Sequence, residues 1–160
     1  MSGSWLQRDL PFLTTENCEI TSPATKRYNC LAWAAGNNTQ WWDPNPLYRW
    51  PSDVPREISL DAVLTVYEKL GFTVCIGGEP EEDFEKIAIF AKKVSGRTVP
   101  THAARQLASG KWTSKLGACE DISHETFDAV NGPLYGEAIC FMSRRKLAVP
   151  EAVNPPSTNG

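Results

Sequence analysis

The segment THAARQLASGKWTSKLG, residues 101–117, contains two short stretches of apolar and alternating residues on either side of the tripeptide ASG. Short stretches of this kind, separated by turn residues, are typical of β-strands. A three-residue loop that ends in glycine suits a β-hairpin. We therefore expect 101–107 and 111–117 to be antiparallel neighbours in a sheet.

The same pattern extends outward from this hairpin. Residues 72–76, 86–93 and 135–144 are short, largely apolar or alternating, and separated by turn residues, which predicts three further strands. A brief helix over about 123–130 is expected between the hairpin and the last strand, with Asp121 or Ser123 at its start.

Two helices are predicted ahead of the strands. Residues 30–35 form a short helix that Asn29 caps and Gly36 ends. Residues 60–70 have apolar side chains at helical spacing, with Ser59 as the cap and Gly71 at the end. Helices followed by an antiparallel sheet predict an α+β fold.

The chain has the length and composition of one globular domain. It has 160 residues, of which 41% are hydrophobic and 22% charged, and cores normally grow in units of about 100–200 residues. We expect one domain over 1–147 and a loose tail, rich in proline, serine, asparagine and glycine, over 148–160. The start lacks the pattern of a signal peptide, and no apolar run has the roughly 20 residues of a membrane span. The expected location is the cytoplasm, or outside the cell by a route without a recognisable signal.

Charge and cysteine spacing exclude several classes of function. The net charge is −3 and no stretch gathers lysine and arginine densely, which argues against nucleic-acid binding. The five cysteines form no CxxC pair and the two histidines form no HExxH motif, so neither a disulfide framework nor a metal site is predicted. No phosphate-binding loop is present either, and we expect no cofactor.

Cys30 is the candidate nucleophile. It occupies the first turn of the predicted helix at 30–35, where unpaired backbone N–H groups favour a thiolate and lower the pKa of the thiol. The alternative is a buried thiol that packs beside Leu31 and Trp33, since cysteine is among the most buried residue types.

His102 is the candidate base. It stands at the start of a predicted strand, from which its imidazole can reach a helix N-terminus that packs against the sheet. An imidazole within hydrogen-bonding distance of a thiol can take its proton and later protonate the leaving group. On its own, His102 is equally well explained as a structural histidine.

The order of these features resembles the papain-like cysteine hydrolases in their NlpC/P60 and CHAP-type arrangement. The segments YNCLAWAAG, THAARQLASGKWTSKLG and EDISH also look like motifs of a poorly characterised bacterial family near that superfamily, over about residues 28–144. The resemblance implies N-terminal helices packed on an antiparallel sheet, with Cys30 as nucleophile and His102 as general base. It also implies peptide or peptidoglycan-like amide substrates.

The residue that orients His102 has two candidates. In the NlpC/P60 arrangement a polar residue lies about a dozen positions after the histidine, and here that spacing falls on Ser114. Asp121 offers a carboxylate, which would hold an imidazole better than a hydroxyl does, although it could equally cap the predicted helix at 123–130. His124, near the start of that helix, is an alternative base or, more simply, a structural group.

Residues next to Cys30 are candidates for contact with the substrate. The backbone N–H of Cys30 could hold an oxyanion, helped by Tyr28 or Asn29, whose other roles would be core packing and helix capping. The proline-rich loop at 37–57 contains three tryptophans, which could line a groove or form a small core beneath the loop.

These features predict a thiol-dependent hydrolase, an amidase, peptidase or deamidase, that uses Cys30 and His102. A toxin effector delivered by a secretion system fits the same residues. The alternative is a non-catalytic binding, immunity or adaptor module with an immunity or target protein as its partner. A redox-active protein that pairs Cys30 with Cys18 is a third reading.

Overall fold

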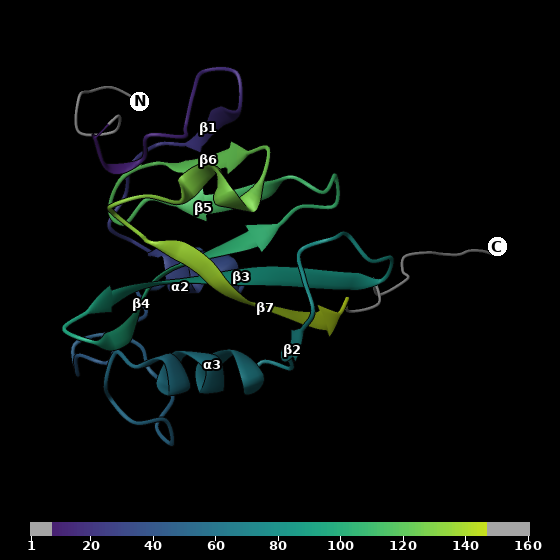
Figure 1. The fold of residues 1–160 in the computed structure, drawn as a ribbon. Coiled ribbons are helices and arrows are strands. Elements are labelled where there is room, and N and C mark those ends of the chain that lie inside the picture. Colours follow the sequence, from purple (N-terminus) through teal and green to yellow (C-terminus); the bar gives the residue numbers. More distant parts are fainter. Residues whose placement is uncertain (1–7, 147–160) are drawn as a thin grey trace, which may run out of the picture.

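The computed structural model describes residues 8–146 of the chain. The elements that lie wholly within these residues are seven strands, two α-helices and one 3₁₀ turn (Figure 1). In chain order these are β1 (Cys18–Ser22), α2 (Cys30–Ala34), α3 (Leu60–Glu68), β2 (Thr73–Cys75), β3 (Phe84–Val94), β4 (Arg97–Gln106), β5 (Trp112–Lys115), β6 (Asp121–His124), η1 (Phe127–Val130) and β7 (Glu137–Arg145).

All seven strands belong to one antiparallel sheet, in the order β1-β6-β5-β4-β3-β7-β2. The long strands β3 and β4 form its centre, and β1 and β2 lie at its two ends, as Figure 1 shows. The predicted hairpin at 101–117 is confirmed as β4 and β5, closed by a hydrogen bond from Leu107 N to Lys111 O.

The expected α+β fold of papain-like type, with N-terminal helices packed on an antiparallel sheet, is wrong. The described part of the chain is β-rich, and its helices α2 and α3 have only 5 and 9 residues. A strand, β1, precedes α2 and α3 and pairs with β6. The region around 121–130, expected to be helical, instead contributes β6 and a single 3₁₀ turn. The two helices predicted from the sequence do form, but they are short. The fold is instead determined by the pairing of strands from distant segments of the chain.

The predicted starts of both helices are confirmed, and the helices end at Ala34 and Glu68, one and two residues earlier than predicted. Asn29 caps α2 by accepting a hydrogen bond from the backbone of Ala32, and Ser59 caps α3 in the same way. Gly36 and Gly71, just beyond the two helices, have φ angles of 89° and 96°, which favour glycine. Among the described residues no helix is long and apolar enough to cross a membrane.

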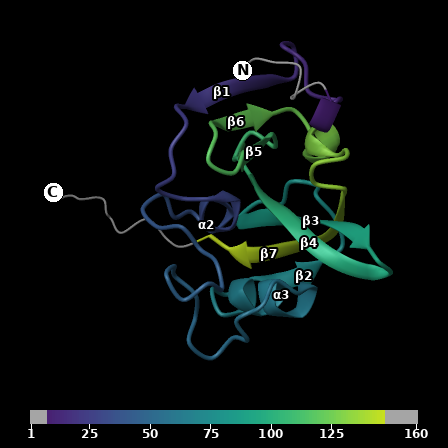
Figure 2. The same cartoon turned by 90° about the vertical axis from the view of Figure 1, so that its left-hand side faces the viewer.

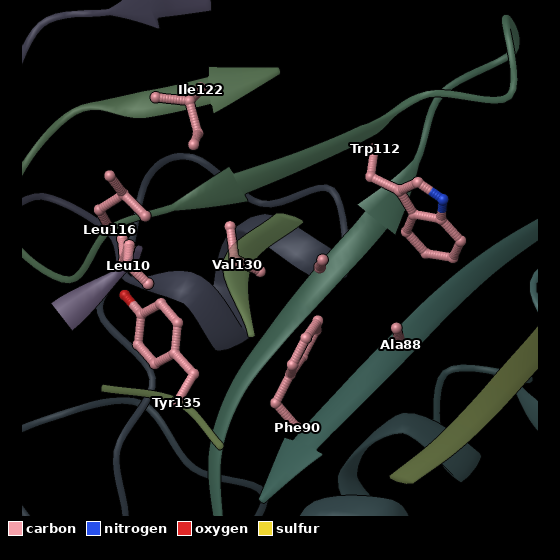
Figure 3. Close-up of a cluster of buried hydrophobic side chains, with 9 residues drawn as sticks. Leu10, Ala88, Phe90, Trp112, Leu116, Ile122, Val130 and Tyr135 are labelled. Carbon is pink, nitrogen blue, oxygen red and sulfur yellow. The ribbon is translucent and has the colours of Figure 1, made fainter. Parts of the chain in front are cut away.

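The two faces of the sheet carry different cores. Both α-helices pack on one face through Ala34, Val63 and Tyr67, against Ile87, Ile89 and Ala103 of the central strands. The aromatic cluster covers the other face and is shown in Figure 3; it comprises Leu10, Ala88, Phe90, Ala104, Trp112, Leu116, Ile122, Val130 and Tyr135. Since neighbouring residues of a strand point to opposite faces, adjacent positions on β4 belong to different cores.

The loop at 37–57 has no helix or strand, as predicted, and joins Trp42 to Arg49 through one isolated bridge. It passes beside α3 in Figure 2. Trp42 and Trp50 are buried there against α2 and α3, which makes them part of a small core. Trp41 is only partly buried and lies near Tyr48.

The sheet has a seam between β4 and β5. Pairing between these strands ends at Arg105 and Thr113, although β4 continues toward Arg97 in full register with β3 apart from one bulge. Beyond that pair, β4 has no strand partner on the side of β5. The predicted site residues gather around this seam.

Candidate functional site

Cys30 is the first residue of α2 and is half-buried. Its sulfur meets the backbone N–H of Ala103, which follows His102 on β4. Leu107 donates its N–H toward β5, and alternate residues of a strand point the same way, so the N–H of Ala103 also points toward β5. The thiol therefore lies on the side of β4 that faces β5.

The pKa of the Cys30 thiol is raised, contrary to the expectation from its place at a helix start. Burial is the main cause, because it penalises the charged thiolate. The backbone N–H groups of Ala103 and Leu31, and the charge of Lys115, lower the pKa by less than burial raises it. At neutral pH Cys30 is therefore a thiol, surrounded by groups that would stabilise its anion.

His102 borders the seam on the face of the aromatic cluster. Its side chain is almost fully buried, stacks on Tyr135 with 3.9 Å between ring centroids, and meets the ring of Phe90 edge-on. In the view of Figure 3, Phe90 and Tyr135 lie on either side of strand β4. Burial, with a smaller effect from His124, lowers the pKa of His102 to about 3. The imidazole is neutral at physiological pH.

The two ring nitrogens of His102 have different surroundings. Nε2 lies 2.9 Å from the hydroxyl oxygen of Ser114 across the seam. Nδ1 is buried and has no hydrogen-bond partner among the described residues. A buried polar atom without a partner is rare in a folded protein, and among the described residues Nδ1 of His102 is one of four such side-chain atoms.

The contact with Ser114 continues to a second histidine. The hydroxyl oxygen of Ser114 lies 2.8 Å from Nε2 of His124, and Nδ1 of His124 lies 2.7 Å from the carbonyl oxygen of Thr126. Ser114 and His124 are at most 1% exposed. The helix predicted around His124 does not form, since His124 ends strand β6, and its side chain joins this hydrogen-bond chain.

Asp121, the other candidate for orienting His102, lies on the opposite face of the sheet. Its carboxylate accepts hydrogen bonds from the hydroxyls of Tyr28 and Thr21. The register pairs Asp121 with Lys115, and the neighbour of Lys115, Ser114, points to the other face. Of the two candidates, Ser114 is the one that contacts His102.

Lys115 is a fully buried cation beneath α2. Its ammonium group donates hydrogen bonds to the carbonyl oxygens of Thr25, Gly117 and Cys119, at 2.8, 2.6 and 2.6 Å. It also lies 5.1 Å from the ring centroid of Tyr28. Burial lowers the pKa of Lys115, and the nearby carboxylate of Asp121 opposes this effect.

Both side chains suggested as helpers of an oxyanion have other partners. The hydroxyl of Tyr28 is bound to Asp121, and burial is the main cause that raises its pKa to about 12. The amide of Asn29 donates to the carbonyl oxygen of Trp42 at 2.7 Å, and its oxygen caps α2. Side-chain help for an oxyanion at Cys30 is therefore not provided by these two residues.

The structure brings Cys30, His102 and Ser114 to the same seam but forms no hydrogen bond between Cys30 and His102. The sulfur approaches β4 from the side of α2, whereas the imidazole extends over the other face. Burial raises the pKa of Tyr135, and the charge of a Cys30 thiolate would add to that rise, so Cys30 lies near the ring that covers His102.

The sequence does not indicate the contact between Tyr135 and His102, and it places His124 on a helix instead of in the hydrogen-bond chain. Nothing in the sequence points to the ring of Tyr135 as the neighbour of His102. His124 had a usable signal, because in the strand sequence DISH the side chains of Ile122 and His124 share one face. That alternation places His124 on the face of the aromatic cluster.

No group of three or more histidine, cysteine, aspartate or glutamate side chains within residues 8–146 could hold a metal ion. All five cysteines are free thiols.

Comparisons with known proteins place the chain in a family. No curated protein and no solved structure matches the sequence. The family described as "Domain of unknown function (DUF7689)" matches residues 19–143, a span that contains the seam and the residues around it. The chain therefore belongs to the DUF7689 family.

Proposed function

We propose that this protein is a thiol-dependent hydrolase of amide or related acyl bonds, with Cys30 as nucleophile and His102 as general base. The observation that carries the proposal is the buried, unpartnered Nδ1 of His102, one residue before the backbone N–H that meets the Cys30 thiol. An imidazole nitrogen with a free lone pair is the atom that a neutral thiol needs as a proton acceptor.

The resting pair is neutral. Burial raises the pKa of the Cys30 thiol and lowers that of the His102 imidazole, so a thiolate–imidazolium ion pair is disfavoured before substrate binds. Proton transfer must then accompany the attack of sulfur on the substrate. The N–H groups that face the sulfur would stabilise negative charge as it develops there.

The reaction has two stages with balanced proton transfers. The sulfur of Cys30 attacks the carbonyl carbon while Nδ1 of His102 takes the thiol proton. The C–N bond then breaks, the amine leaves with that proton, and a thioester remains on Cys30. Water attacks the thioester and gives a proton to Nδ1, the C–S bond breaks, and the carboxylic acid product leaves as the proton returns to sulfur.

Ser114 supports this chemistry by holding the imidazole through Nε2 at 2.9 Å, which leaves Nδ1 for the reaction. The substrate class that we propose is a peptide or peptidoglycan-like amide.

The test is the reactivity of Cys30 compared with other cysteines of the same protein. Cys18 and Cys140 are also half-buried, and burial raises their thiol pKa values as well, so they serve as internal controls. Iodoacetamide labelling at pH 7, followed by mass spectrometry of peptides, gives the rate at each site. We expect Cys30 to react faster than either control, because Nδ1 of His102 can accept the thiol proton as the sulfur attacks the reagent.

Replacement of the base is the second arm of this experiment. His102→Gln should bring the labelling rate of Cys30 down to that of Cys18 and Cys140, without changing theirs. Equal labelling of all three cysteines in the native protein would contradict the proposal. That result would instead favour a non-catalytic binding module, for which the burial of His102 is a purely structural feature.

A further inference from the structure

In the hydrogen-bond chain from Thr126 to His102, the donor and acceptor of each bond can be assigned by starting from Thr126. The carbonyl oxygen of Thr126 can only accept a hydrogen bond, so Nδ1 of His124 carries a proton and donates it at 2.7 Å. Burial lowers the pKa of His124 to about 4, so the ring is neutral at pH 7 and has one N–H. Its Nε2 is therefore a bare acceptor.

Ser114 transmits this direction to His102. A hydroxyl has one proton, and the bare Nε2 of His124, 2.8 Å away, requires Ser114 to donate that proton to it. Toward His102, the oxygen of Ser114 can then only accept. The contact of 2.9 Å must be a donation from Nε2–H of His102, whose Nδ1 is left with a lone pair.

We infer that His124 is a positioning residue that, through Ser114, decides which ring nitrogen of His102 carries the proton. In this role His124 never touches the substrate. It ensures that the nitrogen without a hydrogen-bond partner is a proton acceptor and not a proton donor. The use of that nitrogen by Cys30 rests on the proposed function, whereas the tautomer itself does not.

Burial makes the arrangement specific. His102, Ser114 and His124 are all at most 1% exposed, so water does not compete for their hydrogen bonds. Without an acceptor at position 124, the hydroxyl of Ser114 could rotate and donate to Nε2 of His102, and Nδ1 would then carry the proton. The same atoms permit two opposite proton arrangements, and His124 selects one.

The test is long-range ¹H–¹⁵N NMR of the full chain with ¹⁵N-labelled histidine at pH 7, since bare and protonated ring nitrogens have well-separated shifts. The chain has only two histidines, so assignment needs one variant. We expect Nε2–H for His102 and Nδ1–H for His124. A native spectrum in which His102 carries its proton on Nδ1 would overturn the inference without any further variant.

Substitution tests the cause. His124→Phe keeps a ring at the site but removes the acceptor, and should populate the Nδ1–H form of His102. Ser114→Ala, a smaller change, should do the same. Thr126→Ala is the control, because it retains the backbone carbonyl and should leave the spectrum of His102 unchanged. A folded His124→Phe or Ser114→Ala protein with the native tautomer of His102 would contradict the assigned role.

Cys30 labelling on the same samples separates the two proposals. His124→Phe is expected to slow the labelling of Cys30 by about tenfold or more, as other enzymes lose activity when the base is held in the wrong tautomer. An unreactive Cys30 in the native protein, combined with the expected tautomers, would overturn the proposed function and support the role of His124. A reactive Cys30 in a native protein whose His102 carries its proton on Nδ1 would overturn the role of His124 and support a reactive thiol at Cys30.

Discussion

The two buried histidines make the stability of this protein depend on pH. Burial lowers the pKa of His102 to about 3 and that of His124 to about 4, whereas in the unfolded chain both have the ordinary value of 6.5. Between pH 6.5 and these native values the unfolded chain binds more protons than the native protein. The free energy of unfolding therefore falls as pH decreases through this window, and is unaffected by the histidines above it.

The size of the effect follows from the same values. Each pH unit below 6.5 lowers the free energy of unfolding by about 1.4 kcal/mol for each histidine, so at pH 5 the loss is about 2 kcal/mol per residue and about 4 kcal/mol for the pair. Ordinary carboxylates stay largely ionised between pH 7 and 5, so they contribute little in this range. A loss of this size is a large part of the total stability of a typical domain.

Urea unfolding followed by tryptophan fluorescence at pH 7 and pH 5 measures the effect. With a denaturant dependence of about 2 kcal/mol per molar urea, the midpoint should fall by about 2 M at the lower pH. His102→Gln has one buried histidine fewer and should show about half the difference between the two pH values. Free energies within about 1 kcal/mol of each other at pH 7 and pH 5 would refute the reasoning.

Two further predictions concern close packing and a buried charge. A Cβ at Gly136 would lie 2.0 Å from the carbonyl oxygen of Ala91, so Gly136→Ala should lower the free energy of unfolding by more than about 2 kcal/mol. Gly136 and Gly96 have similar φ angles, 74° and 78°, but a Cβ at Gly96 would meet open space. Gly96→Ala should therefore lower the free energy of unfolding by only about 1 kcal/mol, with both variants measured by thermal denaturation. Lys115→Met removes a buried ammonium group together with its three hydrogen bonds and should lower the free energy of unfolding by about 3 kcal/mol. Lys111→Met, at an exposed ion pair, should change stability by less than about 1 kcal/mol, and equal effects at the two lysines would contradict the importance of burial.

The predictable parts of the fold were those that depend on neighbours in sequence. Asn29 and Ser59 cap helices as expected, because capping involves a side chain and a backbone group three residues later. The alternating segments after residue 70 are strands for the same local reason. The order of strands in the sheet depends on contacts between distant segments, and the pairing of β1 with β6 had no signal in either segment alone.

The site was predictable only in part. Ser114 was one of two candidates to orient His102, suggested by the spacing in the NlpC/P60 arrangement, and it is the one that contacts His102. Asp121 was favoured for its charge, but in the actual register it pairs with Lys115, so its carboxylate points to the opposite face. The raised pKa of Cys30 was missed because the effect of a helix start is small beside the cost of burying a thiolate.

The seam between β4 and β5 has a consequence for how the molecule opens. Across it, the only ladder pairs among the described strands join Arg105 to Thr113 and Gln106 to Trp112, whereas β3 and β4 are joined along most of their length. Local unfolding of a sheet costs least where the fewest backbone hydrogen bonds must break. The sheet therefore divides into two parts, β1-β6-β5 and β4-β3-β7-β2, and the hydrogen bond between Ser114 and His102 joins them. Loss of that hydrogen bond would change both the proton arrangement at His102 and the stability of the contact between the two parts.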